Sequence, residues 1–373
     1  MRGITRAAST FYRLVSVVTL TVITVLCLCD AKAECRFDQG AAAQSAMPLL
    51  GGAISVGRDV PLGTEVFRQT YHVPIAGSVV CDAGLYSIQR LRSLPVTPLP
   101  LAGWAGPPWP GKVYETGVAG LGVAYSVDGI ALPSVTYHAN CGAGADDCHW
   151  NDIQQFMDVN VALIKAGPVA AGQIDGTMLP VMEQTWRSSN DLLVQRVAMT
   201  GMLSVHSRTC NTPDVAVYLG RHPVAAFAAA PQTEWVDFSI RLTDCPAFLG
   251  FYSGVGPRWG SDGSVTGLNS RIGSVLRYQL DPVVAPIDAM AGIIDLNGTS
   301  VADASSAQGV GIQIADRQGN SIQLSRIVDS HITPTAIEGE QYAIDLRAHY
   351  VKTADLVTPG RADGSVVFTI IYH

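Results

Sequence analysis

A short stretch between two cysteines holds the side chains best suited to chemistry in this sequence. Polar and aromatic residues stand within and beside the segment from Cys141 to Cys148: Asn140, Asp146, Asp147, Trp150 and Asn151. Amides and carboxylates exchange hydrogen bonds with a polar ligand, and the face of a tryptophan ring packs against its apolar side. A disulfide across the segment would hold these groups in place and lower the entropy cost of binding. The stretch is a candidate ligand site, and the alternative is a solvated hairpin tip closed by a disulfide.

A second aromatic stretch runs from Trp104 to Trp109 among prolines and glycines. Its two tryptophans could add stacking surface to a ligand site. Packing of these rings against prolines in a structural loop is the simpler interpretation.

Three histidines precede residue 197, and two of them flank the same cysteine segment: His72, His138 and His149. Imidazole is a frequent zinc ligand, and three imidazoles with an open fourth position form a site that can bind a further group. Scattered histidines with ordinary hydrogen bonds are the alternative. We therefore expect no cofactor and keep a zinc site on these three residues as a second hypothesis.

Signatures of catalysis and of nucleic-acid binding are missing from the sequence. It contains no H-E-x-x-H, no G-x-S-x-G, no Walker loop and no dinucleotide fingerprint. Asp146 and Asp147 are adjacent, so in a strand they point apart, which suits a paired-carboxylate glycosidase poorly. Charged residues make up 15% of the chain, the net charge is −7, and basic clusters are lacking. We expect neither an enzyme nor a nucleic-acid-binding protein.

The start of the chain has the three parts of a secretory signal. Basic residues precede an apolar run and a short Ala-x-Ala site: Arg2, Arg6, Arg13, residues 14–28 and residues 31–33. This order predicts a signal peptide over residues 1–33, with cleavage before Glu34. The apolar run is shorter than the roughly 20 residues that a transmembrane helix needs. We therefore expect export.

Cysteines that follow the predicted signal are even in number. Two of the eight, Cys27 and Cys29, lie within it, so six remain: Cys35, Cys81, Cys141, Cys148, Cys210 and Cys245. An even number in an exported chain predicts disulfides, and six cysteines allow 15 pairings. The simplest pairing is sequential: Cys35–Cys81, Cys141–Cys148 and Cys210–Cys245. Zinc binding is the rival interpretation, but no C-x-x-C spacing is present.

Turn signals recur along the chain and predict strands between them. They are Asp128-Gly129, Asp175-Gly176, Asp262-Gly263, Asn297-Gly298 and Asp363-Gly364. Short runs of alternating apolar residues separate them, and helical periodicity is nearly absent. The 373 residues exceed what one sandwich domain usually holds. We therefore predict an all-β protein with two β-sandwich domains.

The most regular pattern lies at the end, in residues 360–373. Val366, Phe368, Ile370 and Tyr372 alternate, so in a strand their side chains point to one face. The Asp363-Gly364 pair before them is a turn signal. Such a strand at the end of a chain is an edge that needs a pairing partner.

This stretch resembles the terminal strand of chaperone–usher fimbrial subunits, which carries a glycine fourteen residues from the end and a penultimate tyrosine. Gly360 and Tyr372 occupy those positions. Residues 202–210, 212–220 and 235–246 are similar to strands of a pilin domain, the first and last of them carrying Cys210 and Cys245. The resemblance implies that the C-terminal domain is an incomplete immunoglobulin-like sandwich that lacks its last strand.

Assembly rather than catalysis is what this resemblance implies. In such subunits a chaperone strand fills the groove in the periplasm, and a donor strand of a neighbouring subunit later replaces it. The implied partners are a periplasmic chaperone, an outer-membrane usher and an adjacent pilin subunit. The resemblance assigns five residues to the chaperone and polymerisation interface: Gly360, Val366, Phe368, Ile370 and Tyr372.

The long segment before the pilin-like part exceeds a donor extension and resembles the arrangement of a two-domain tip adhesin. Residues 114–123 and 161–169 are similar to segments of fimbrial adhesin domains, although mannose specificity cannot be transferred. We expect a lectin-like receptor-binding domain over residues 34–196 and a pilin domain over residues 197–373. The junction lies between Trp186 and Ser207.

The resemblance also gives the candidate ligand site a ligand class, a surface glycan. The expected function is a tip adhesin that is exported through the periplasm and attaches the cell to surface receptors. One alternative is a non-adhesive minor or tip-capping structural subunit. The other is a zinc-dependent adhesin that promotes cell aggregation or biofilm.

Overall fold

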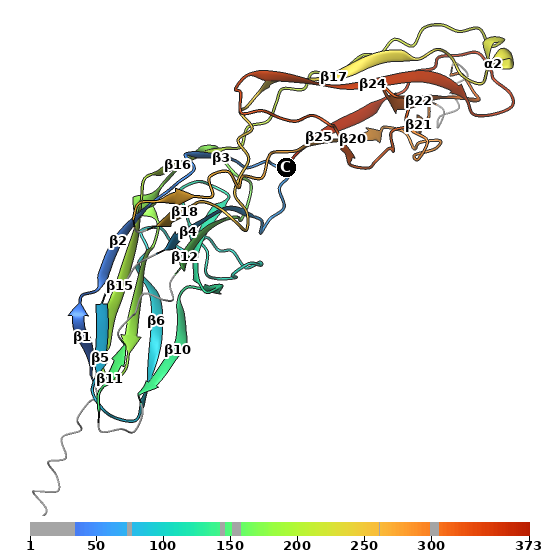
Figure 1. Ribbon diagram of the computed structural model, residues 1–373. Coiled ribbons are helices and arrows are strands. Elements are labelled where there is room, and N and C mark those ends of the chain that lie inside the picture. The colour runs from blue at the N-terminus through green and yellow to red at the C-terminus, as the bar shows by residue number, and fades with distance from the viewer. Residues whose placement is uncertain (1–33, 73–76, 142–145, 151–157, 261, 299–305) are drawn as a thin grey trace, which may run out of the picture.

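The computed structural model describes residues 34–72, 77–141, 146–150, 158–260, 262–298 and 306–373 (Figure 1). The expected signal peptide and Asn151 lie outside these residues. The described part is almost entirely β, as predicted; its helices are the short α2 (Ala226–Ala229) and a single 3-10 turn (Gly176–Met178). No helix in it is long and apolar enough to cross a membrane.

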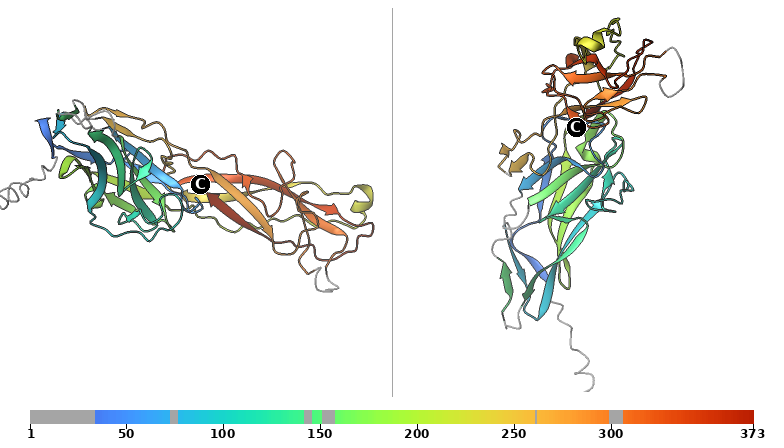
Figure 2. Two further views of the ribbon diagram at one scale, coloured as in Figure 1. Left: turned by 90° about the horizontal axis from the view of Figure 1, so that it is seen from below. Right: turned by 90° about the vertical axis from the view of Figure 1, so that its right-hand side faces the viewer.

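Two separate apolar cores divide the described chain into two units that lie end to end (Figure 2). The first core extends from Cys35 to Val205 and also contains Phe251 and Tyr252. The second extends from Cys210 to Tyr372. We call these the first unit and the second unit.

The first unit is built from four sheets. The five-stranded sheet has the order β10 (Ser134–Cys141), β6 (Tyr86–Val96), β14 (Val181–Arg187), β15 (Asp191–Thr200) and β2 (Ala43–Pro48). The seven-stranded sheet contains β19 (Val265–Thr266), β18 (Arg258–Gly260), β4 (Glu65–His72), β12 (Asp158–Lys165), β8 (Leu121–Val127) and β7 (Tyr114–Glu115), with β9 (Ile130–Ala131) paired to β8. One of the two smaller sheets has the order β1 (Cys35–Gly40), β5 (Gly77–Cys81) and β11 (Cys148–Trp150). The other has the order β13 (Gly172–Asp175), β16 (Met202–His206) and β3 (Ala53–Ser55).

The second unit packs two sheets around its core. One has the order β17 (Val236–Cys245), β24 (Glu340–Lys352), β22 (Val310–Asp316) and β21 (Ile293–Ile294). The other has the order β23 (Val328–Asp329), β20 (Leu276–Pro282) and β25 (Val366–Tyr372). In β24 the apolar Ile344, Leu346 and Ala348 are buried, because alternate side chains of a strand share a face. β25 forms the last strand of its sheet.

A segment of the later chain, residues 250–272, returns to the first unit. β18 pairs in parallel with β4, and Trp259 stacks on Tyr71 with ring centroids 4.7 Å apart. Tyr252 is buried in the first core, where its hydroxyl donates to the carbonyl of Leu268 at 3.1 Å. A Cβ on Gly256 would lie 1.8 Å from the carbonyl oxygen of Arg68, so only glycine allows this approach. The first unit is therefore completed by residues far along the sequence.

The strand at residues 202–206 lies elsewhere than expected. The resemblance predicts the first strand of the pilin domain here, but β16 pairs with β3 and β13, and Leu203 and Val205 lie in the first core. Its alternation fits an apolar core of either unit, so the pattern alone does not choose between them. The expected boundary at residue 197 falls inside β15. We propose that the chain passes between the units at residues 206–210.

Tyr252 tests whether the returning segment stabilises the first unit. We expect Tyr252→Ala to lower the free energy of unfolding by about 3 kcal/mol, because a buried aromatic side chain is lost from the core. Tyr252→Phe, which loses only the hydrogen bond to Leu268, should cost about 1 kcal/mol. Urea unfolding followed by tryptophan fluorescence measures both. An unchanged midpoint for Tyr252→Ala would show that the segment contributes nothing.

Candidate functional site

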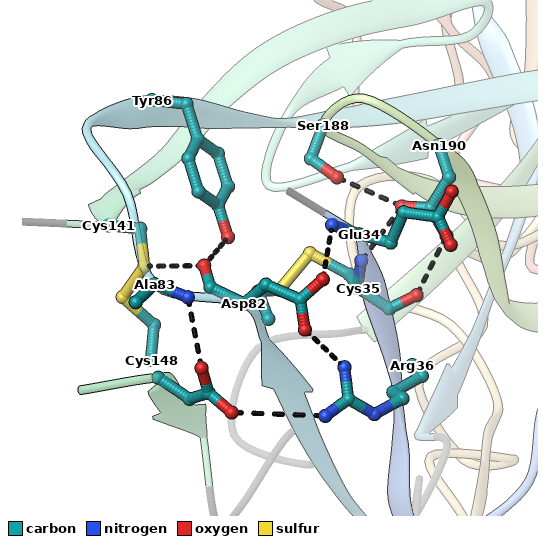
Figure 3. The surroundings of a disulfide bond; sticks show 12 residues. Glu34, Cys35, Arg36, Asp82, Ala83, Tyr86, Cys141, Cys148, Ser188 and Asn190 are labelled. Atoms are coloured by element: carbon teal, nitrogen blue, oxygen red, sulfur yellow. Dashed lines mark hydrogen bonds and ion pairs between the residues drawn. A yellow bond between two sulfur atoms is a disulfide. The ribbon is translucent and has the colours of Figure 1, made fainter. Parts of the chain in front are cut away.

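Two disulfides, Cys35–Cys81 and Cys141–Cys148, crosslink the end of the first unit that lies farthest from the second (Figure 1). We call this end the stapled end. Cys81 on β5 is in register with Cys35 on β1, its disulfide partner, and with Cys148 on β11, which is bonded to Cys141 (Figure 3). The third disulfide, Cys210–Cys245, lies in the second unit. The structure thus contains the sequential pairing that the sequence analysis favoured.

A charged network surrounds these disulfides. Arg36 donates from Nη1 to Asp82 Oδ1 at 2.5 Å, and its Nη2 lies 3.8 Å from Asp147 Oδ2. Asp82 Oδ2 accepts from the backbone amide of Glu34 at 3.1 Å, and Asp147 Oδ1 accepts from that of Ala83 at 3.0 Å. The hydrogen bond from Arg36, followed by that from Glu34, lowers the pKa of Asp82. The two carboxylates therefore connect β1 with the residues that follow β5 and those that precede β11.

The predicted ligand-site residues take different positions around this end. Asn140, Asp146 and Asp147 are exposed, and Trp150 on β11 is half-buried. Trp150 turns toward the interior, where its ring centroid lies 5.6 Å from that of Trp186 in an edge-on arrangement. Asn140 and Asp146 keep their exposed polar groups, whereas Asp147 is tethered to Ala83. The structure therefore gives Trp150 a packing role that the sequence did not indicate.

Arg36, Asp82 and Trp186 were missed by the sequence analysis. Arg36 and Asp82 each follow a half-cystine of the same bond, Cys35–Cys81. Because Arg36 lies opposite Val80 in the antiparallel register, Asp82 is its diagonal neighbour just beyond the end of β5. That adjacency was a usable signal once the pairing was assumed. Trp186 gave no such signal, because its contact with β11 depends on how two different sheets meet.

The three histidines lie apart. His72 is bonded through Nδ1 to Asp158 Oδ1 at 2.8 Å, and Arg258 binds the other oxygen of Asp158 at 2.6 Å. His149 is exposed on β11, and His138 lies on β10 against Trp186. Within the described residues, no group of three His, Cys, Asp or Glu side chains could hold a metal ion. The structure does not assemble the hypothetical zinc site.

His138 packs as an aromatic ring rather than as a ligand. Its centroid lies 4.3 Å from that of Trp186 and 5.9 Å from that of Trp150. Both ring nitrogens are buried without a hydrogen-bond partner in the part of the chain that the structure describes. Burial, and second the charge of Arg90, lower the pKa of His138 to about 4. The ring is therefore neutral at physiological pH.

The Trp104–Trp109 stretch forms a structural loop. Trp104 donates from Nε1 to the carbonyl of Pro108 at 3.0 Å. A Cβ on Gly106 would lie 2.7 Å from the same ring, so glycine and indole are packed closely. The Trp104 ring therefore packs within its own Pro/Gly loop and is not free to stack on a ligand.

An apolar groove of about 810 Å³ opens along the second unit. Side chains from both of its sheets and from the preceding extended segment line it, among them Val215, Leu219, Phe238, Ile312, Val366 and Phe368. Gly360 also lies on its wall. Ile370 and Tyr372 do not line the groove, and they are only 5% and 4% exposed. Of the five predicted interface residues, the structure places three at the open groove and two in a covered position.

One edge of β25 faces away from its sheet. The carbonyl of Ser365 accepts from Val283, and His373 exchanges two hydrogen bonds with Val275, so odd-numbered residues face β20. The backbone groups of even-numbered residues, from Val366 to Tyr372, point to the outer edge, because these directions alternate in an antiparallel pair. Beside Val366 and Phe368 this edge borders the groove.

Comparison with known proteins agrees with this geometry. Residues 198–373 match the family model described as fimbrial protein. The C-terminal part of the chain is a fimbrial protein domain. This match confirms the fimbrial character that the sequence analysis predicted for it. No curated protein sequence matches the chain.

Solved structures that align with the chain are distant in sequence. The CupB6 tip adhesin from Pseudomonas aeruginosa is 14% identical over 91% of this chain and 95% of its own, with a TM-score of 0.31. The P pilus rod subunit PapA is 15% identical over 44% of this chain and 100% of its own, with a TM-score of 0.30. The CsuC–CsuE chaperone–tip adhesion subunit complex of Acinetobacter baumannii is 10% identical over 91% of this chain and 100% of that chain, with a TM-score of 0.24. Residue roles therefore rest on the geometry of this chain.

The lowered pKa of His138 predicts a loss of stability in acid. A neutral buried imidazole stabilises the fold at pH values above its unfolded pKa of about 6.5. That contribution should be lost as the pH falls from 6.5 toward 4, where the folded form also takes up the proton. The free energy of unfolding of the wild type should therefore fall more steeply between pH 7 and 4 than that of His138→Phe, measured by urea unfolding at each pH. Parallel curves would contradict the prediction.

Proposed function

We propose that the protein is a tip adhesin of a chaperone–usher fimbria, whose second unit accepts a β-strand from another subunit. The observation that carries the proposal is the apolar groove beside the outer edge of β25, within a fimbrial protein domain. A strand added there would bond to the outward backbone groups of Val366 and Phe368. Its alternate side chains would bury the apolar lining, which gives affinity and register together.

The groove also supports a choice of partners for the second unit. An exposed apolar groove next to an unpaired edge promotes aggregation, so the subunit needs a covering strand during export. A periplasmic chaperone supplies that strand before assembly at the outer-membrane usher, and the donor strand of the neighbouring pilin supplies it in the fibre. The protein acts by assembly and binding, and it is not an enzyme.

The first unit binds a surface receptor, a glycan, at its stapled end. This end lies opposite the second unit, so in a fibre attached through the groove it points outward (Figure 1). The exposed Asn140 and Asp146 offer an amide and a carboxylate there, and the Arg36 network holds the neighbouring loops. Groups fixed before binding lose little entropy when a ligand arrives. These features support a position at the tip of the fimbrium, on the cell surface.

Two adjacent valines test the role of the groove. Val366 lines it, whereas Val367 is 57% exposed and does not. We expect Val366→Asp to abolish capture by the chaperone and surface display, because a carboxylate enters the apolar contact with the added strand. Val367→Asp introduces the same charge one residue away and should be displayed like the wild type. Equal display of both variants, measured with antibody on whole cells, would refute strand addition at this groove.

A glycan array tests the receptor. The full chain is required, because β16 and residues 250–272 complete the first unit. We expect binding to a defined set of glycans that withstands EDTA, and a loss of about tenfold in affinity for Asp146→Asn or Asn140→Ala, the effect of one hydrogen bond. Asp262→Asn, on an exposed turn remote in sequence, is the control.

Other outcomes of the array point to the alternative functions. Binding that EDTA abolishes would favour a metal-dependent adhesin whose metal is held by groups other than the separated His72, His138 and His149. No binding to any glycan would favour a tip-capping structural subunit and would overturn the assignment of a glycan receptor.

A further inference from the structure

A loop of the first unit covers the end of the last strand of the second. This 57–59 loop, Gly57 to Asp59, lies on the outer edge of β25. Arg58 donates from Nη2 to the carbonyl of Ile370 at 3.3 Å. The amide of Tyr372 donates to Asp59 Oδ2 at 3.0 Å, and the amide of Asp59 donates to the carbonyl of Tyr372 at 3.3 Å. Three hydrogen bonds thus occupy the outward backbone groups that an added strand would use.

The loop is built for this close approach. A Cβ on Gly57 would lie 2.2 Å from the carbonyl oxygen of Tyr372, so any larger residue would push the loop off the strand. Lys165, only 2% exposed, donates from Nζ to the carbonyls of Gly57 at 3.1 Å and Arg58 at 2.5 Å. An ammonium group buried at this position fixes the loop from the side of the first unit.

The outer edge of β25 is therefore divided in two. Val366 and Phe368 border the open groove, while Ile370 and Tyr372 are buried and bonded to the loop. We propose that the 57–59 loop is a stop, which ends the strand-accepting edge after Phe368 and so sets the register of the incoming strand. This inference rests on the proposed function of the groove.

Alternation of side chains alone does not fix the register of an added strand, and a stop would fix it. A slip of one residue would turn the apolar side chains of an added strand away from the groove, so the pattern forbids it. A slip of two residues keeps the same faces, and the pattern does not distinguish the two registers. A strand that extended to Tyr372 would have to break three hydrogen bonds and move a loop held by Lys165. A strand that ends opposite Phe368 breaks none, so the loop selects that register.

The test uses the full chain and a synthetic peptide of seven alternating valines and threonines, the length of β25, with a lysine at each end. Two variants open the stop by different means. Arg58→Ala/Asp59→Ala removes its side-chain hydrogen bonds, and Gly57→Ala wedges it away without removing any donor or acceptor. Asp59→Asn keeps an acceptor oxygen for Tyr372 and is the matched control. Amide hydrogen exchange, followed residue by residue by NMR, is measured with and without the peptide.

In the wild type and in Asp59→Asn, the peptide should slow exchange at Val366 and Phe368 while the amide of Asp59 stays protected. In both opened variants the amide of Tyr372 should exchange quickly without peptide, and the peptide should restore at least tenfold protection there. The stretch of β25 that the peptide protects should thus extend to Tyr372 only in the variants that open the loop.

Two results would overturn the proposal in distinguishable ways. If the peptide accelerates exchange at Asp59 in the wild type while Tyr372 stays protected, the strand displaces the loop, and the groove works without a stop. The same conclusion follows if the opened variants show no protection at Tyr372. If the peptide protects no amide of β25 in any form, the groove accepts no strand, and the proposed function fails together with the stop.

Discussion

Unpaired backbone groups along the outer edge of β25, next to an apolar groove, are the constraint on which the rest of this structure depends. A sheet edge of this kind binds any available strand, including that of another copy. The second unit cannot satisfy the edge with its own chain, because Val366 and Phe368 face a groove that its described residues leave open. The proposed strand addition follows from that requirement, because a strand from another chain would satisfy the edge and cover the groove together.

Each unit contributes a short segment that packs against the other unit. Residues 250–272 leave the second unit to complete the seven-stranded sheet of the first, with Trp259 stacked on Tyr71. The 57–59 loop leaves the first unit to cover the end of β25. The chain thus crosses the junction more than once, unlike a simple linker.

Charged side chains at the stapled end connect its strands rather than standing free. Asp82 and Asp147 share Arg36 and accept from backbone amides, so they fix the loops instead of offering free carboxylates. The interior below is aromatic, with His138 held neutral against Trp186. Asn140 and Asp146 lie outside this network and are exposed, which is why the proposed receptor site includes them.

Local pattern determined much of this protein by itself. Repeated turn pairs and alternating runs specified an all-β fold, and the terminal alternation specified which side chains of β25 share a face. Alternation fixes a face but says nothing about what covers it, because sheet partners come from distant parts of the chain. Only the tertiary structure decided that β16 packs in the first unit, that Trp150 turns toward Trp186, and that three predicted zinc ligands lie apart. The same reason applies to Tyr372: the sequence placed it on the strand, and a loop more than three hundred residues earlier, bonded through Asp59, decided that its edge is closed.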